Sequence, residues 1–151
     1  MASAGQEIHN RLTGERIVFR TTAAETGGEL LVFDTHWPRP GHRAAEHIHP
    51  EIEERFTVLG GMAALRIDGT EQMLRKGDSL AVAPGTPHLA WNPSDAPVHL
   101  RLEFRPALRW EDFTERLFTI SSEEIAVSAG APDIARLTEL LREFQREIIL
   151  P

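Results

Sequence analysis

Between about residue 15 and residue 105, hydrophobic residues occur in short runs that alternate with polar residues and end at glycine, proline or aspartate. A period of two is typical of β-strands with one buried face, so each run predicts a short strand. The predicted strands span residues 17–19, 29–37, 42–49, 54–59, 62–67, 70–74, 80–83, 88–91 and 98–104. Short strands separated by turn signals, such as Asp68-Gly69, indicate an all-β sandwich or barrel. No segment between them resembles a crossover helix, so we expect antiparallel sheets.

The pattern changes to a helical period after residue 106. The first helix is predicted from apolar residues three or four positions apart, Trp110, Phe113, Leu117 and Ile120. A second helix, with Pro132 in its first turn, is predicted from a stripe formed by Ile134, Leu137, Leu141, Phe144 and Ile148. Residues 121–130 are expected to connect the two. Such stripes must be buried, here against the barrel or a partner subunit.

These patterns divide the chain into three parts. We expect a loosely docked lead-in over residues 1–14, a β-barrel over residues 15–106 and a helical extension over residues 107–151. A length of 151 residues fits one domain with a substantial core.

Composition and charge exclude several classes of function. The net charge is −7, and no basic stripe is available for phosphate contacts, so we expect no nucleic-acid partner. The chain has no cysteine, which excludes disulfides, thiolate metal sites and a cysteine nucleophile. The segment 1–16 lacks the apolar core of a signal peptide, and no apolar run approaches the roughly 20 residues of a membrane span. We therefore expect a cytoplasmic protein without a membrane partner.

Candidate chemistry lies in the stretch from Gly41 to Gly61. His47 and His49 are two residues apart, so on a strand both imidazoles point to the same face. After Pro50 the chain can bend and return on a neighbouring strand, which brings a glutamate to the same place. Imidazole and carboxylate groups together are typical ligands of first-row metal ions.

The alternation of the following strand selects between two adjacent glutamates. Glu54 shares its face with Phe56 and Val58, whereas Glu53 shares its face with Arg55. A shift of one residue moves every side chain to the opposite face, so the apolar pattern favours Glu54 as the residue that points inward.

A second stretch, from Gly77 to Asn92, contains a short apolar strand, a Pro/Gly turn and then His88. With the first stretch, it resembles the cupin family. The first family motif, G-x5-H-x-H-x3,4-E-x6-G, is matched by Gly41, His47, His49, Glu54 and Gly61. The second, G-x5-P-x-G-x2-H-x3-N, is matched by Gly77, Gly85, His88 and Asn92, with Ala83 at the proline position and Pro84 one residue later.

This resemblance implies a double-stranded β-helix or jelly-roll cupin barrel, followed here by two C-terminal α-helices. It also implies that His47, His49, Glu54 and His88 ligate a divalent transition metal, which is Fe(II), Mn, Ni, Cu or Zn. Such a site keeps one or two coordination positions open for substrate, water or dioxygen. Small cupins often form homodimers, so we expect a homodimer.

The resemblance further implies a metal-dependent enzyme that acts on a small organic molecule inside the barrel. Fe(II) dioxygenase or other oxidoreductase chemistry is the first hypothesis. One alternative is a metal-dependent isomerase or cyclase of bacterial small-molecule metabolism, in which the ion acts as a Lewis acid. Another is a cupin that binds a small ligand without catalysis, because one fold hosts many functions.

Four further residues are candidates for the pocket or its support. Arg43 has the parity of His47, so it either points into the barrel and holds an anionic substrate or lies on a loop. Arg101 and Glu103 lie on the polar face of the last strand, which is either solvated or lines the pocket mouth, where both would contact substrate. Asn92 either supports a ligand through a hydrogen bond or belongs to an Asn-Pro turn, which is the more common role.

Overall fold

The computed structural model describes residues 2–41, 45–128 and 134–151. One sheet has six strands in the order β1-β2-β3-β9-β4-β7, and the other has three in the order β6-β5-β8. The strands are β1 (Glu7–His9), β2 (Arg16–Thr21), β3 (Leu31–Trp37), β4 (Glu53–Gly60), β5 (Met62–Ile67), β6 (Thr70–Arg75), β7 (Ser79–Val82), β8 (His88–Trp91) and β9 (Val98–Arg105). The helices are α1 (Ala23–Thr26), α2 (Trp110–Ser128) and α3 (Ile134–Glu143).

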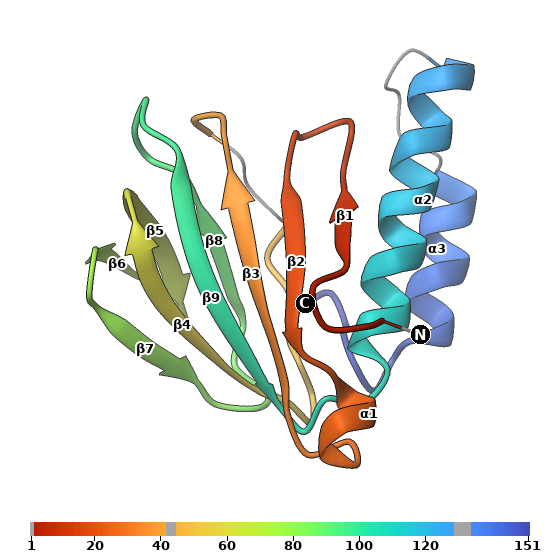
Figure 1. The fold of residues 1–151 in the computed structure, drawn as a ribbon, viewed down its shortest axis with the longest axis horizontal. Helices are drawn as coiled ribbons and strands as arrows, with labels where there is room; N and C mark the ends of the chain where they lie inside the picture. The colour runs from red at the N-terminus through yellow and green to blue at the C-terminus, as the bar shows by residue number, and fades with distance from the viewer. Residues whose placement is uncertain (1, 42–44, 129–133) are drawn as a thin grey trace.

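The paired strands run antiparallel to each other. Along each strand, buried and more exposed side chains alternate, which separates the core from the surface. In β9, Val98, Leu100, Leu102 and Phe104 are buried, while the residues between them are half-buried. Their face belongs to one hydrophobic cluster that also contains Phe56 of β4 and Leu65 of β5. The core therefore lies between the two sheets, and the predicted jelly-roll architecture is confirmed (Figure 1).

The β5–β6 hairpin forms where the Asp-Gly signal predicts it. Asp68 and Gly69 have φ values of 48° and 82°, and two consecutive positive φ angles match the right-handed twist of the flanking strands. The register Ile67↔Thr70 closes directly on this turn.

The C-terminal helices lie side by side next to β1 and β2, away from the small sheet (Figure 1). Phe113 of α2 packs edge-on against Phe144, just after α3, with ring centroids 5.5 Å apart. Phe118 of α2 joins the same core cluster as Phe19 of β2. The predicted face of α2 thus contributes to the packing between the helices, whereas Phe118, which lies outside that face, joins the barrel core.

The structure differs from the sequence prediction at several element boundaries. Residues 7–9 of the expected lead-in form β1, which pairs with β2. In the described part of the strand expected at 42–49, only isolated bridges occur, at His47 and Ile48. Helix α2 runs through most of the expected connector, to Ser128. Pro132, expected in the first turn of the second helix, lies outside the described residues.

The second apolar stripe is confirmed at Leu137, Leu141, Phe144 and Ile148, which pack in the helical cluster, but not at its first residue. Ile134 is 67% exposed, so including it was wrong, whereas Leu140 is buried. Across the described residues, no helix has both the length and the apolar character needed to cross a bilayer.

Candidate metal centre

Four side chains from three parts of the chain meet inside the barrel: His47, His49, Glu54 and His88. One possible ligand atom from each lies within 4.8 Å of all the others. His49, Glu54 and His88 are 2%, 5% and 1% exposed, and His47 is half-buried. The expected convergence of these residues is therefore present, with Glu54 rather than Glu53 pointing inward.

Local structure explains how these residues come together. His47 pairs with His88 in an antiparallel bridge, with backbone N–H···O distances of 3.0 and 2.9 Å in the two directions. Glu54 lies near the start of β4, opposite Phe104 of β9, on the face that carries the core residues. The Pro-Gly turn after β7 is held by a hydrogen bond from the Gly85 N–H to the His49 carbonyl at 2.9 Å.

The three imidazoles share one hydrogen-bonding arrangement. Each Nδ1 lies against a backbone carbonyl: Ala45 for His47 at 2.7 Å, Glu147 for His49 at 2.8 Å and Thr86 for His88 at 2.8 Å. Because a carbonyl oxygen only accepts, each Nδ1 carries the hydrogen. In the neutral ring, Nε2 then has a free lone pair, which is the form that binds a metal ion.

Glu54 provides the negative charge at the centre of the cluster. Its Oε1 lies 3.0 Å from Nε2 of His49 and 2.9 Å from Nε2 of His88. Burial opposes ionisation, but the hydrogen bonds with His49 and His88 outweigh it and hold the pKa of Glu54 well below its usual range. For His88, burial acts to lower the pKa, yet the hydrogen bond with Glu54 prevails and raises it.

His47 has the opposite protonation preference. Burial, followed by the positive field of His49, lowers the pKa of His47 to about 4. The ring is therefore neutral at pH 7 and can ligate an ion without first losing a proton.

Aromatic rings surround the buried histidines. The ring of His49 is edge-on to Phe104 at 5.2 Å and to Trp110 at 5.0 Å, and Phe56 is edge-on to His88 at 6.3 Å between centroids. The Nε1 of Trp110 is buried, with no hydrogen-bond partner among the described residues. These apolar walls exclude water and strengthen electrostatic interactions inside the site. No sequence motif pointed to Trp110 as a neighbour of the cluster.

The polar candidates on β9 lie on the other side of the sheet. Arg101 and Glu103 alternate with the buried Leu102 and Phe104, so both point away from the cluster. Arg101 instead binds Asp34 of β3 through Nε at 2.8 Å. Neither residue therefore faces the cluster, because the barrel side of β9 is filled by its apolar residues.

The two remaining candidates are Asn92 and Arg43. Asn92 is fully buried; its amide donates to the carbonyls of Arg39 and Ala96, and its oxygen accepts from the Ser94 N–H. It thus fixes the 92–97 turn, as expected from the Asn-Pro signal. Arg43 lies outside the described residues.

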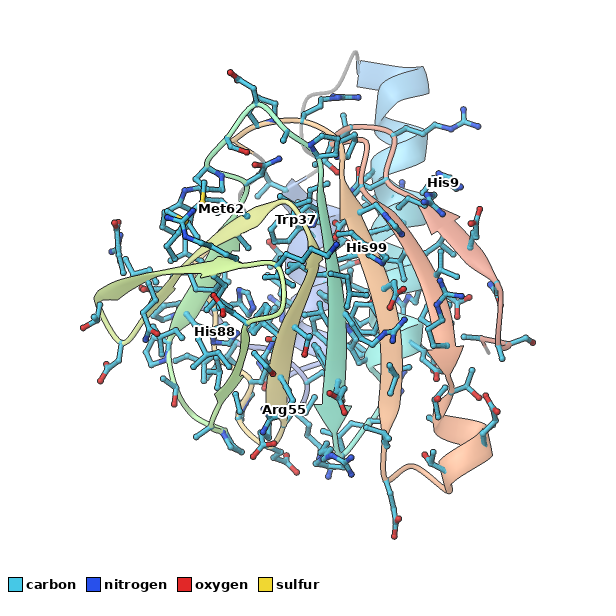
Figure 2. The ribbon with its side chains drawn as sticks, turned by 60° about the vertical axis from the view of Figure 1, so that its left-hand side comes forward. His9, Trp37, Arg55, Met62, His88 and His99 are labelled. Atoms are coloured by element: carbon cyan, nitrogen blue, oxygen red, sulfur yellow. The ribbon has the colours of Figure 1, made fainter. Side chains whose placement is uncertain are left out.

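An open pocket of about 390 Å³ lies where β3 and β4 end and β9 begins, at the other end of β4 from Glu54. Its lining includes Trp37, Gly61 and His99. In Figure 2 the labelled Trp37 and His99 lie higher in the view than His88, which is buried. None of the four clustered residues lines this pocket.

Comparison with known proteins identifies the family of the barrel region. Residues 38–104, which contain all four clustered residues, match the model of the Cupin domain family. These residues form a cupin domain. Within the solved structures, an RmlC-like cupin from Shewanella frigidimarina is similar, with a TM-score of 0.60 and 24% identity over 75% of this chain and 93% of the other. At that identity the similarity concerns the fold alone.

Two curated relatives of the cupin domain are similar over about half of the chain. Protein SchB of Streptomyces halstedii is 33% identical over 86 residues, which are 57% of this chain and 60% of SchB. Quercetin 2,3-dioxygenase of Bacillus subtilis is 35% identical over 79 residues, which are 51% of this chain and 23% of the dioxygenase. The match therefore covers less than two thirds of either relative.

Proposed function

We propose that this cupin domain binds a divalent transition-metal ion through His47, His49, Glu54 and His88, and uses it to transform a small organic molecule. Within that class, oxygen-dependent chemistry at Fe(II) is the first candidate. The sequence similarity to quercetin 2,3-dioxygenase supports this choice. An isomerase or cyclase reaction at the same ion remains the alternative.

The hydrogen bonds of the three imidazoles carry the proposal. Every Nδ1 is already used as a donor to a carbonyl, so the Nε2 atoms of His49 and His88 face one carboxylate oxygen of Glu54. If both rings are neutral, lone pairs on two nitrogens and one anionic oxygen oppose one another in a buried space. A cation is needed there, either as protons on the rings or as a metal ion. A metal ion satisfies all four groups at once.

The donor set also fits such an ion chemically. Imidazole nitrogen and carboxylate oxygen suit Fe(II), Mn, Ni, Cu and Zn, and the absence of cysteine excludes thiolate ligation. A first-row ion with an open position supplies either dioxygen activation or Lewis-acid polarisation of a substrate oxygen. The protein contributes rigid orientation of the imidazoles through three carbonyls, one negative charge from Glu54 and a water-excluding wall formed by Phe104 and Trp110.

Metal binding is tested with a pair of adjacent glutamates. Glu54→Gln keeps the shape of the side chain but removes its charge, whereas Glu53→Gln changes a half-buried residue outside the cluster. We expect Glu54→Gln and His88→Ala to weaken binding of Co²⁺ by about a hundredfold or more, because each removes a ligand from a set of four. Glu53→Gln should bind as the wild type does. Affinity is measured by titration, and bound metal by elemental analysis of freshly purified protein.

Two outcomes decide the proposal. Wild-type protein that contains no metal after growth with ample metal and purification without chelators contradicts it. If metal is bound, oxygen uptake with Fe(II)-loaded protein and quercetin as the first probe tests the oxygenase hypothesis. Conversion of a substrate without oxygen uptake would favour the isomerase or cyclase alternative.

A further inference from the structure

Residues 144–149, which follow α3, lie directly beside the three-histidine cluster; they are called here the C-terminal segment. Ile149 and Ile48 exchange both backbone hydrogen bonds, each with an N···O distance of 2.9 Å. This isolated antiparallel bridge attaches the segment to the residue between His47 and His49. The end of the described chain is thus fixed next to the candidate ligands.

Side chains just before that bridge anchor the C-terminal segment. Phe144 and Ile148 are buried in the cluster formed by α2 and α3. Arg146 forms a two-armed ion pair with Glu51, at 3.0 and 2.8 Å. The ion pair is exposed and contributes little by itself, whereas burial of the two apolar side chains holds the segment against the helices, next to the barrel.

One hydrogen bond from this segment enters the cluster itself. The Glu147 carbonyl accepts from Nδ1 of His49 at 2.8 Å, and the two residues are 98 positions apart in the sequence. The other two imidazoles differ, because His47 and His88 each bond to a carbonyl only two residues away. The orientation and tautomer of His49 alone therefore depend on the docking of a distant element.

We propose that the C-terminal segment is a positioning element of the metal centre, and that its docking is coupled to metal binding. The segment holds His49 with Nδ1 protonated and Nε2 directed at the ion, and it closes that side of the site to water. This inference rests on the proposed metal-binding function. Because coupling between two binding events is reciprocal, metal binding must stabilise docking by the same factor by which docking strengthens metal binding.

A pair of proline substitutions tests the coupling in the full-length protein. Ile149→Pro removes the N–H that bonds to Ile48, and so weakens the bridge without touching a ligand. Leu150→Pro introduces the same residue one position later, at a 51% exposed side chain outside the bridge. With Co²⁺ as the probe, we expect Ile149→Pro to weaken binding by about tenfold, the range typical for partners of metal ligands. Leu150→Pro should remain within about twofold of wild type, because it removes no hydrogen bond of the bridge.

Two further measurements separate positioning from general destabilisation. In protein loaded with diamagnetic Zn²⁺, nitrogen chemical shifts of the imidazoles should show His49 bound through Nε2 with Nδ1 protonated in the wild type and as a mixture in Ile149→Pro, with His47 and His88 unchanged. In the wild type, hydrogen exchange of the Ile149 and Ile48 amides should slow by about tenfold on addition of Co²⁺, because the coupling is reciprocal. This second measurement needs no variant, so it decides the question if Ile149→Pro does not fold.

The possible failures are distinguishable. If the wild type does not bind Co²⁺, the proposed function fails, and this inference fails with it. If the wild type binds Co²⁺ but both proline variants bind equally well, and exchange at Ile149 and Ile48 is unaffected, only the coupling is wrong.

Discussion

At the scale of single residues, Asp34 is a buried carboxylate that lies outside the candidate metal centre. Its side chain is fully buried, and its carboxylate accepts hydrogen bonds from Arg20, His99 and Arg101 on the outer face of the large sheet. Burial opposes ionisation, but the bonds from Arg101 and His99 prevail and lower the pKa of Asp34 from 3.8 to about 2. The folded protein therefore favours the ionised carboxylate more than the unfolded chain does.

This shift predicts how Asp34 affects acid stability. The unfolded carboxyl takes up a proton first as pH falls, so the stabilisation is complete above about pH 4 and disappears toward pH 2. It amounts to at most about 2 kcal/mol, because solvent reaches both guanidinium groups. We expect Asp34→Asn to lower the free energy of unfolding at pH 7 by that amount, and the difference from wild type to shrink below pH 4. Urea unfolding at several pH values measures this; Asp95→Asn, at an exposed position, is the control. A difference independent of pH would contradict the assignment.

Residue patterns predicted most of the candidate site but not its supporting contacts. The spacing of His47 and His49, and the alternation that selects Glu54, follow from the geometry of a strand. The inclusion of His88 followed from the cupin resemblance rather than from the pattern alone. The carbonyl of Glu147 was not predictable, because every residue has a carbonyl and only the fold decides which one meets an imidazole.

At the scale of elements, the β4–β5 turn depends on one glycine. Gly61 has a φ of 73°, and a Cβ added there would lie 2.3 Å from the backbone oxygen of Pro97. The backbone of the neighbouring loop cannot move away as a flexible side chain would. Gly61 therefore combines a left-handed conformation with a close approach of two backbone segments.

Two alanine substitutions separate these effects. Gly69 has a similar φ of 82°, but an added Cβ there meets nothing within 4 Å. We expect Gly69→Ala to cost about 1 kcal/mol from backbone strain alone, and Gly61→Ala to cost at least about 2 kcal/mol more because of the clash. Thermal and urea unfolding of both variants measure the difference. Equal losses of stability would show that the β4–β5 turn relaxes around the added methyl group.

Elements with strong alternation were predicted closely, and those with weak or short signals were not. The bounds of β5 and β8 agree with the prediction because apolar runs end at clear turns. Strand β1 has only three residues and a mostly exposed pattern, so only pairing with β2 reveals it. Helix α1 begins with a capping box formed by Thr22 and Glu25. This motif is visible in the sequence, but hydrophobic periodicity does not reveal it.

At the scale of the whole molecule, the sheets and the helices serve different parts of the candidate site. The cupin barrel supplies the four possible ligands, whereas the helical extension supplies Trp110 and the carbonyl of Glu147. The motifs predicted the barrel and its cluster. The position of the extension was not predictable, because an apolar helix face indicates that the face is buried but does not identify the surface that covers it.

The edge-on contact between Trp110 and His49 gives the protein an intrinsic optical signal. The indole lies 5.0 Å from an imidazole of the cluster, at an interplanar angle of 90°. An ion with a partly filled d shell, bound at that imidazole, should quench the fluorescence of this indole far more than that of a remote one. Titration with Cu²⁺ should therefore reduce the emission of the wild type, while Trp110→Phe, which keeps Trp37 and Trp91, should lose most of the response. Equal quenching in both proteins would show that the ion binds away from His49.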